Sequence, residues 1–236
     1  MPDMKEISII TGGNSGLGLA LAEVMVSKGF NMAIIGRNIE KVEKAVNILM
    51  ERNGNVTVIG FPGDITDESF VHETYDSLVA EGWIIKKLFN CAGIGRFGKP
   101  ENNTREMIDV NLGASVIGTI LMSTSALKVM KETGGTIVNI MSSAAFKGSP
   151  NESVYCASKW AARGYTEALR TYLKGSSIKV VGVYPSGMNT PFWSPNCGES
   201  PDTSKLMNPA EVAEEILYAV QGRLSMYVSD IVINKL

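Results

Sequence analysis

The chain has 236 residues, 44% of them hydrophobic, with 22 Lys and Arg against 24 Asp and Glu and a formal net charge of −2 at pH 7. Its length predicts a single domain over residues 1–236, and its hydrophobic content excludes a mainly disordered chain. The near-neutral charge removes the main argument for a nucleic acid or an anionic membrane as partner.

Short β-branched segments alternate along the chain with longer segments of helical period. The predicted strands are residues 7–11, 31–35, 56–61, 87–91, 136–141, 179–184 and 226–233. The predicted helices lie near residues 16–28, 39–52, 67–81, 106–132, 154–174 and 209–221. Because strands that alternate with helices are typical of β-α-β units, we predict an α/β fold with a doubly wound, seven-stranded parallel sheet and helices on both faces.

A glycine-rich turn, residues 11–18, joins the first predicted strand to the first predicted helix. Residues without a Cβ allow a tight turn and a close approach of the backbone to a pyrophosphate, and a helix N-terminus attracts phosphate groups. This context predicts a dinucleotide-binding turn, with a purely structural turn as the alternative. The residues assigned to the cofactor here are Thr11, Gly12, Asn14, Ser15, Gly16, Leu17 and Gly18.

The spacing Gly-x-x-x-Gly-x-Gly after a threonine resembles the short-chain dehydrogenase/reductase family. This resemblance implies a Rossmann-type fold and a nicotinamide-dependent oxidoreductase. Residues 90–93 (Asn-Cys-Ala-Gly) are similar to the family's Asn-Asn-Ala-Gly segment, with Cys91 in place of the second Asn. Asp64 matches the aspartate that the family directs at the adenine. The resemblance therefore adds cofactor contacts at Asp64, Ile65, Asn90, Ala92 and Gly93. The alternatives are a helix cap for Asp64 and an ordinary glycine turn after Asn90.

The end of the second predicted strand bears on the choice of cofactor. An acidic side chain there would bind the ribose 2′-hydroxyl of NAD(H), whereas an arginine accommodates the 2′-phosphate of NADP(H). Gly36 occupies the acidic position and Arg37 follows it. We therefore predict a preference for NADP(H) over NAD(H). The alternative is that Arg37 is a solvated charge at the start of the next helix.

Residues 110–127 form a long uncharged segment, which raises the possibility of a membrane-spanning helix. The segment is too polar to face lipid, because it contains the polar residues Asn111, Ser115, Thr119, Ser123, Thr124 and Ser125. We therefore predict a buried helix. Asn111 matches the family's helix asparagine, and the resemblance implies that it supports a water-linked proton relay to Lys159. The alternative is a buried amide that is satisfied by ordinary hydrogen bonds.

Tyr155 and Lys159 form a Tyr-x-x-x-Lys motif at the start of the helix that follows strand 136–141, and Ser142 ends that strand. Positions i and i+4 share a helix face, and ligands bind at the carboxyl edge of parallel sheets. Tyr155 is the predicted general acid/base, Lys159 the cation that lowers its pKa, and Ser142 a hydrogen-bond donor to the substrate oxygen. In the resembled family the lysine also holds the nicotinamide ribose, so Tyr155 and Lys159 count as cofactor contacts too. The alternative is that these are ordinary loop and helix residues.

The Pro-rich segment 185–208 is the predicted substrate loop, because long irregular loops in compact domains tend to be functional. Residues 184–190 resemble the family's Pro-Gly segment, which implies cofactor contacts at Pro185, Gly187, Met188 and Thr190; here Ser186 follows the proline. The predicted substrate contacts are the aromatic residues Phe146, Phe192 and Trp193. A surface excursion, with its aromatic side chains as core filler, is the alternative.

We therefore predict an NADP-dependent carbonyl reductase or alcohol dehydrogenase that acts on a small to medium-sized apolar ketone or aldehyde. The alternatives are a 3-oxoacyl-acyl-carrier-protein reductase and a non-catalytic NADP(H)-sensing protein. By analogy with the resembled family, the two long helices would pair copies of the chain into a homodimer or homotetramer. Three cysteines without metal-ligand spacing, and no targeting pattern at the N-terminus, predict a cytoplasmic protein without a metal site.

Overall fold

One parallel sheet organises the computed structural model, which describes residues 5–193, 197–199, 201–221 and 226–236. Seven strands lie in the order β3-β2-β1-β4-β5-β6-β7. Their bounds are β1 (Glu6–Thr11), β2 (Asn31–Gly36), β3 (Val58–Pro62), β4 (Ile84–Asn90), β5 (Gly135–Ile140), β6 (Ile178–Pro185) and β7 (Asp230–Ile233). The direction of winding reverses between the neighbouring strands β1 and β4, which is where ligands bind in such sheets. The predicted fold class is confirmed.

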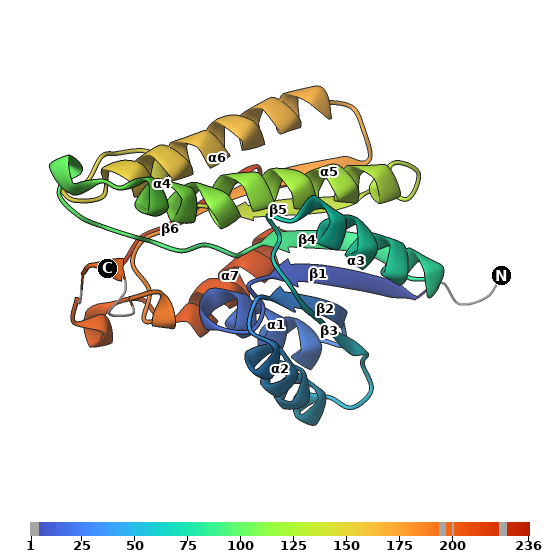
Figure 1. The fold of residues 1–236 in the computed structure, drawn as a ribbon. Helices are drawn as coiled ribbons and strands as arrows, with labels where there is room; N and C mark the ends of the chain where they lie inside the picture. The colour runs from blue at the N-terminus through green and yellow to red at the C-terminus, as the bar shows by residue number, and fades with distance from the viewer. Residues whose placement is uncertain (1–4, 194–196, 200, 222–225) are drawn as a thin grey trace.

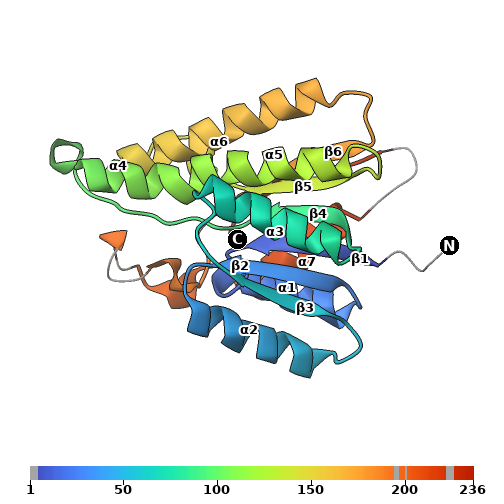
Figure 2. The same ribbon diagram turned by 45° about the vertical axis from the view of Figure 1, so that its right-hand side comes forward.

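Helices cover both faces of the sheet in two layers (Figure 1). One layer contains α1 (Gly16–Ser27), α2 (Ile39–Arg52) and α7 (Pro209–Ala219). The other contains α3 (Glu68–Ala80), α4 (Arg105–Leu112), α5 (Thr119–Met130) and α6 (Ser153–Tyr172), as the turned view in Figure 2 also shows. Short 3-10 helices are η1 (Pro100–Asn102), η3 (Ser143–Ala145), η4 (Pro191–Trp193) and η6 (Thr203–Lys205).

The two layers bury opposite sides of each central strand. On β1, Ile10 packs among residues of α1, α2 and α7, whereas Ile7 and Ile9 pack among residues of α3, α5 and α6. Successive strand residues point to opposite faces, so a strand that is covered on both faces needs apolar residues at consecutive positions. This explains the nearly continuous apolar segments from which the strands were predicted.

The predicted helix 106–132 is interrupted. It consists of α4, a π-helical segment η2 (Gly113–Gly118) and α5. A Cβ on Gly118 would lie 2.5 Å from the Ile65 side chain, so the helix approaches the loop after β3 closely at this point. By length and composition, Arg105–Met130 could cross a membrane. In this fold it packs over the sheet, and Asn111, Ser115, Ser123 and Ser125 are buried.

The predicted last strand, residues 226–233, is wrong in its first half, because β7 begins only at Asp230. Arg170 lies at this boundary. Its guanidinium donates to the carbonyl oxygens of Val180 (3.2 Å) and Ser229 (2.7 Å) and pairs with Asp230 at 3.0 Å. The Ser229 carbonyl also accepts from the Gly182 N–H at 2.9 Å, so Arg170 and β6 share this acceptor just before β7 begins. The other predicted bounds differ from the observed ones by three residues or fewer.

Candidate active site

Two cavities lie at the carboxyl edge of the sheet. The first, here called the glycine-turn cavity, has a volume of about 490 Å³ and extends from Gly12 to Arg37 and Asp64. The second, the tyrosine cavity, has a volume of about 220 Å³ and lies against Ser142 and Tyr155. A Cβ on Gly16 would lie 3.4 Å from the Cβ of Thr190, which lines the tyrosine cavity. The glycine turn therefore lies beside the second cavity as well as the first.

The glycine turn has the close packing that its sequence predicts. Gly12 and Gly16 have φ values of +68° and +54°, a region that favours glycine. A Cβ on Gly12 would lie 3.0 Å from the Cα of Ala92, and one on Gly18 would overlap the Gly12 carbonyl oxygen. The Ala92 N–H donates to Thr11 Oγ1 at 3.1 Å. The turn is thus held against the segment that follows β4.

The predicted cofactor residues divide into those that line the glycine-turn cavity and those that support it. The lining residues are Gly12, Asn14, Ser15, Arg37, Asp64, Ile65, Ala92 and Gly93. Thr11 and Leu17 are buried behind the turn. Lys41, Gly36 and Asp109 also line the cavity but were not predicted.

Asp64 and Asp67 have different tasks in the loop after β3. Asp67 caps α3 by accepting from the backbone N–H groups of Ser69 and Phe70. Asp64 Oδ1 accepts from the Thr66 N–H (2.9 Å) and hydroxyl (2.8 Å). The helix cap considered as an alternative for Asp64 is therefore supplied by Asp67, and Asp64 remains on the cavity wall.

Asn90 lies in the interior of the protein and does not line either cavity. Its amide nitrogen donates to Asn139 Oδ1 (2.8 Å) and Ser123 Oγ (3.2 Å). This network joins β4, β5 and α5 beneath the carboxyl edge. The side chain of Asn90 therefore supports the segment that carries Ala92 and Gly93.

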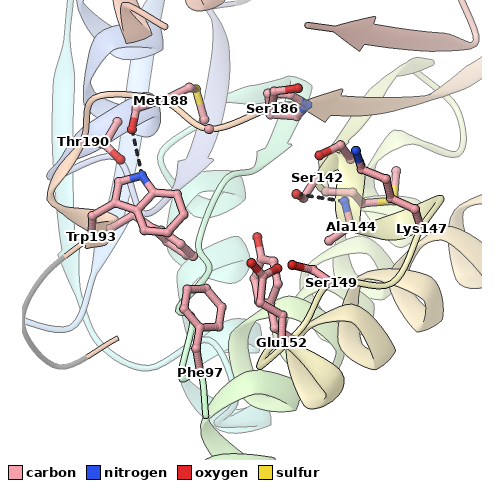
Figure 3. Close-up of a pocket in the computed structure, with 16 residues that line it drawn as sticks. Phe97, Ser142, Ala144, Lys147, Ser149, Glu152, Ser186, Met188, Thr190 and Trp193 are labelled. Carbon is pink, nitrogen blue, oxygen red and sulfur yellow. Dashed lines mark hydrogen bonds between the residues drawn. The ribbon is translucent and has the colours of Figure 1, made fainter. Parts of the chain in front are cut away.

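Tyr155, on α6, and Ser142, at the end of β5, line the tyrosine cavity. Figure 3 shows Ser142 on the cavity wall. Ser142 Oγ accepts from the Ala144 N–H at 3.2 Å, which fixes the serine at the start of η3. Tyr155 is 8% exposed, and the Phe97 ring contacts it edge-on at a centroid distance of 5.3 Å. Burial raises the pKa of the Tyr155 phenol, and its hydrogen bond with Ser142 opposes this. The phenol is thus neutral at pH 7 and able to donate a proton.

Lys159 follows Tyr155 by one turn of α6 and lies behind it. Its side chain is 5% exposed, and its Nζ is 5.6 Å from the centroid of the Tyr155 ring. A Cβ on Gly93 would lie 3.4 Å from this Nζ, so the amine also approaches the wall of the glycine-turn cavity. Burial lowers the pKa of Lys159 to about 8, against an opposing effect of Cys91. The amine is therefore mostly charged at pH 7 and close to both cavities.

Asn111 is completely buried and holds the segment after β4 against α4. Its amide nitrogen donates to the carbonyl oxygens of Met107 (2.8 Å) and Arg96 (3.0 Å), and its Oδ1 accepts from the Arg96 N–H at 3.2 Å. These contacts correspond to the structural alternative considered for this residue. The relay role stays a prediction.

The predicted substrate loop forms one wall of the tyrosine cavity, although its residues 194–196 and 200 lie outside the described residues. Predicted residues on this wall are Pro185, Gly187, Met188, Thr190, Phe192 and Trp193. The Trp193 Nε1–H donates to the Met188 carbonyl at 3.0 Å, and its ring packs edge-on against Phe192 at 5.3 Å. The two aromatic residues thus present an apolar surface to the cavity.

The prediction that Phe146 lines the substrate pocket is not met. Its ring lies 4.4 Å from that of Tyr184 and 4.5 Å from the Arg163 guanidinium, is 40% exposed, and does not line the tyrosine cavity. The short helix η3 turns the chain after Ser142. The side chains of Ser143 and Ala144 therefore take the place that we expected for Phe146.

Sequence reasoning missed Phe97, Lys147, Ser149 and Glu152, which also line the tyrosine cavity. Glu152 carried a signal, because it precedes Tyr155 by three positions and such residues are neighbours on a helix. No sequence pattern marks Phe97, because its position depends on a contact between two distant segments. The Phe97 N–H donates to the Cys197 carbonyl at 2.7 Å.

The sequence profile of the family described as short chain dehydrogenase matches residues 6–198. A 3-oxoacyl-[acyl-carrier-protein] reductase of Homo sapiens is 31% identical over 188 residues, which cover 79% of this chain and 77% of that protein. A short-chain dehydrogenase/reductase from Vibrio parahaemolyticus superposes with a TM-score of 0.84 at 32% identity, covering 96% of each chain. An alcohol dehydrogenase from Thermococcus sibiricus, complexed with 5-hydroxy-NADP, superposes with a TM-score of 0.88 over 97% of this chain and 96% of that one. Because the sequence identity is 20%, this structural similarity shows a shared fold and nothing about function.

Proposed function

The chain belongs to the short-chain dehydrogenase family of oxidoreductases, and from this premise we propose that it reduces the carbonyl group of a small to medium-sized apolar ketone or aldehyde with NADPH. The observation that carries the proposal is the placement of Tyr155: its neutral phenol faces a cavity beside Ser142, with the Lys159 amine behind it.

The residues of the glycine-turn cavity fit a nicotinamide dinucleotide. The cavity lies at the N-terminus of α1, where Ser15 makes no capping hydrogen bond with its side chain, so the first backbone N–H groups of the helix have no side-chain acceptor. Such groups and the helix dipole favour a phosphate. Gly12, Gly16 and Gly18 leave room where any Cβ would clash or strain the backbone. Asp64 would hold the adenine half, and Lys159 the ribose beside the nicotinamide.

Two features at the end of β2 and the start of α2 support a preference for NADPH. Arg37 and Lys41 both line the cavity, and their positive charges favour a 2′-phosphate. A Cβ on Gly36 would lie 2.5 Å from Asn14 Oδ1. The acidic side chain that would bind a free 2′-hydroxyl therefore has no room at this position unless Asn14 moves.

The roles of the residues around Tyr155 follow from the charge that develops on the substrate. When bound, the reduced nicotinamide supplies a hydride to the carbonyl carbon, which leaves negative charge on the carbonyl oxygen. Tyr155 donates its proton to that oxygen, and Ser142 donates a hydrogen bond that stabilises the developing charge. Lys159 stabilises the phenolate that Tyr155 becomes. In the reverse direction, Tyr155 accepts the proton of an alcohol.

The tyrosine cavity supports a substrate of modest size. Its volume of about 220 Å³ lies below the range of about 300–1,000 Å³ that is common for ligand pockets. Phe97, Phe192 and Trp193 give it an apolar wall opposite Ser142. A second candidate is the reduction of a 3-oxoacyl group on an acyl carrier protein, because a relative with 31% identity carries that name.

An assay of NADPH oxidation over a panel of carbonyl compounds tests the proposal. Replacing a proton-transfer group typically costs about 10²–10⁴-fold in rate, so we expect Tyr155→Phe to lose turnover by this factor while its Kd for NADPH, measured by fluorescence titration, changes little. Tyr172→Phe is the matched control, because Tyr172 lies exposed on the same helix. Full turnover by Tyr155→Phe would exclude the role of this residue. Binding of NADPH by the wild type without turnover of any compound, including an acyl-carrier-linked one, would favour a sensor.

We further propose that the chain is a single cytoplasmic domain that assembles into a homodimer or homotetramer. The exposed side chains of Ile117 and Trp160 on the layer that contains α5 and α6 support assembly through this layer.

A further inference from the structure

One feature of the tyrosine cavity is unexpected for an apolar substrate: a carboxylate on its wall. Glu152 lines the cavity together with Tyr155, three positions further along α6. In Figure 3 the Glu152 side chain rises into the cavity beside Ser149. The carboxylate lies close enough to the phenol that faces the substrate carbonyl for its charge to raise the pKa of Tyr155.

Glu152 has no structural task that explains this position. It is the N-cap residue of α6, but its side chain makes no capping hydrogen bond. Ser149 donates a hydrogen bond to it, and no cation pairs with it among the residues that the structure describes. A half-buried carboxylate without a cationic partner is costly, unless a ligand supplies the partner.

The charges around Glu152 favour a cationic ligand group over an anionic one. Glu199 lies near enough to raise the pKa of Glu152, as burial also does, so a negative charge is already concentrated at this end of the cavity. Lys147 is the cation on the same wall, but its side chain is exposed and forms no salt bridge with Glu152 in the described part of the chain. Solvent screens an exposed ammonium, so the Glu152 charge dominates beside Tyr155.

We propose that Glu152 is a specificity-determining residue that selects carbonyl substrates bearing an amino group, or another strong hydrogen-bond donor, on the carbon next to the carbonyl carbon, and rejects those with a carboxylate at that position. The inference rests on the proposed function, since it takes the carbonyl to lie against Tyr155 and Ser142. The apolar wall of Phe97, Phe192 and Trp193 then receives the rest of the substrate. Such a substrate is an amino ketone with an apolar or aromatic body.

Three compounds of similar size that share a phenyl ketone test the proposal: 2-amino-1-phenylethanone (cationic), 1-phenylpropan-1-one (neutral) and phenylglyoxylate (anionic). For the wild type at pH 7 with saturating NADPH, we expect kcat/KM to fall in that order. A hydrogen bond to a charged group contributes about 1.5–3 kcal/mol, so in Glu152→Gln the ratio of the cationic to the neutral compound should fall by about 10–150-fold. The ratio of the anionic to the neutral compound should rise.

Two control variants distinguish the effect of the Glu152 charge from a general effect of substitution on the structure. Glu152→Asp keeps the charge and should retain the wild-type order of the three compounds. Glu167→Gln removes a negative charge from the exposed side of the same helix, where Glu167 pairs with Arg163, and should leave all ratios unchanged. Equal kcat/KM for the three compounds in the wild type, or wild-type ratios in Glu152→Gln, would overturn the inference even if that variant were poorly folded. Absence of turnover of every carbonyl compound would overturn the proposed function, and the inference with it.

Discussion

At Lys159, the proposed catalytic role and the stability of the fold place opposite requirements on the charge of the amine. Its charge stabilises the proposed phenolate, yet burial disfavours that charge and lowers its pKa from 10.5 to about 8. Below pH 8 the folded protein keeps a buried ammonium that the unfolded chain would expose to water. Stability is thus reduced at neutral pH, and it rises as pH increases from about 8 to 10.5, because the unfolded state binds more protons in this window.

We therefore expect Lys159→Met to be more stable than the wild type at pH 7 while losing most of its turnover. The shift in pKa from 10.5 to about 8 corresponds to a gain on the order of 3 kcal/mol in the free energy of unfolding. Thermal unfolding of the protein without cofactor, measured from pH 7 to pH 10.5, should show a gain in Tm that is largest at pH 7 and shrinks above pH 8. A gain that does not vary with pH would contradict this explanation.

Arg37 is the residue on which the proposed cofactor preference depends most. Because loss of a charge-assisted hydrogen bond costs about 1.5–3 kcal/mol, we expect Arg37→Ala to lower kcat/KM for NADPH by about 10–150-fold. The value for NADH, which has no 2′-phosphate, should change little. Lys44→Ala on the exposed face of α2 is the control and should affect neither cofactor, since Lys44 does not line the cavity. Equal losses for NADPH and NADH would contradict the assignment.

At the scale of elements, the sequence predicts what is encoded within one strand, turn or helix. The alternation of apolar segments predicts all seven strands, since a strand buried on both faces must be apolar throughout. The glycine turn and the Tyr155–Lys159 pair are also local, because their spacing alone puts the residues on one turn or one helix face. These features appear in the structure at the expected ends of β1 and α6.

The sequence did not predict features that depend on contacts between elements, because no residue pattern within a single element encodes them. The π-helical segment η2 has no local sign, because apolar residues continue through it, and its geometry follows the approach of Gly118 to Ile65. The start of β7 coincides with contacts to Arg170, which lies on α6 and far from β7 in the sequence. Phe146 was expected in the cavity from its place in the chain, but η3 directs it to Tyr184 instead.

At the scale of the whole molecule, one helical layer serves both the site and the proposed assembly. The layer of α4, α5 and α6 covers one face of the sheet (Figures 1 and 2), and α6 carries Tyr155 and Lys159 on its buried side. On its outer side Trp160 is 49% exposed, next in sequence to the lysine. A partner copy on this layer would cover Trp160 and stabilise the helix that holds the proposed catalytic pair.

We expect the wild type to be a dimer or tetramer and Trp160→Glu to be monomeric in sedimentation equilibrium at micromolar concentration, because a buried charge without a partner strongly destabilises an interface. Met50→Glu is the control: Met50 is 47% exposed on α2, in the opposite layer, and this variant should keep the wild-type mass. Since assembly adds stability by mass action, the wild-type Tm should rise with protein concentration, whereas the Tm of Trp160→Glu should not. A monomeric wild type, or a Trp160→Glu variant with wild-type mass, would show that this layer does not join copies of the chain, and α6 would then depend on its own packing against the sheet to hold Tyr155 in place.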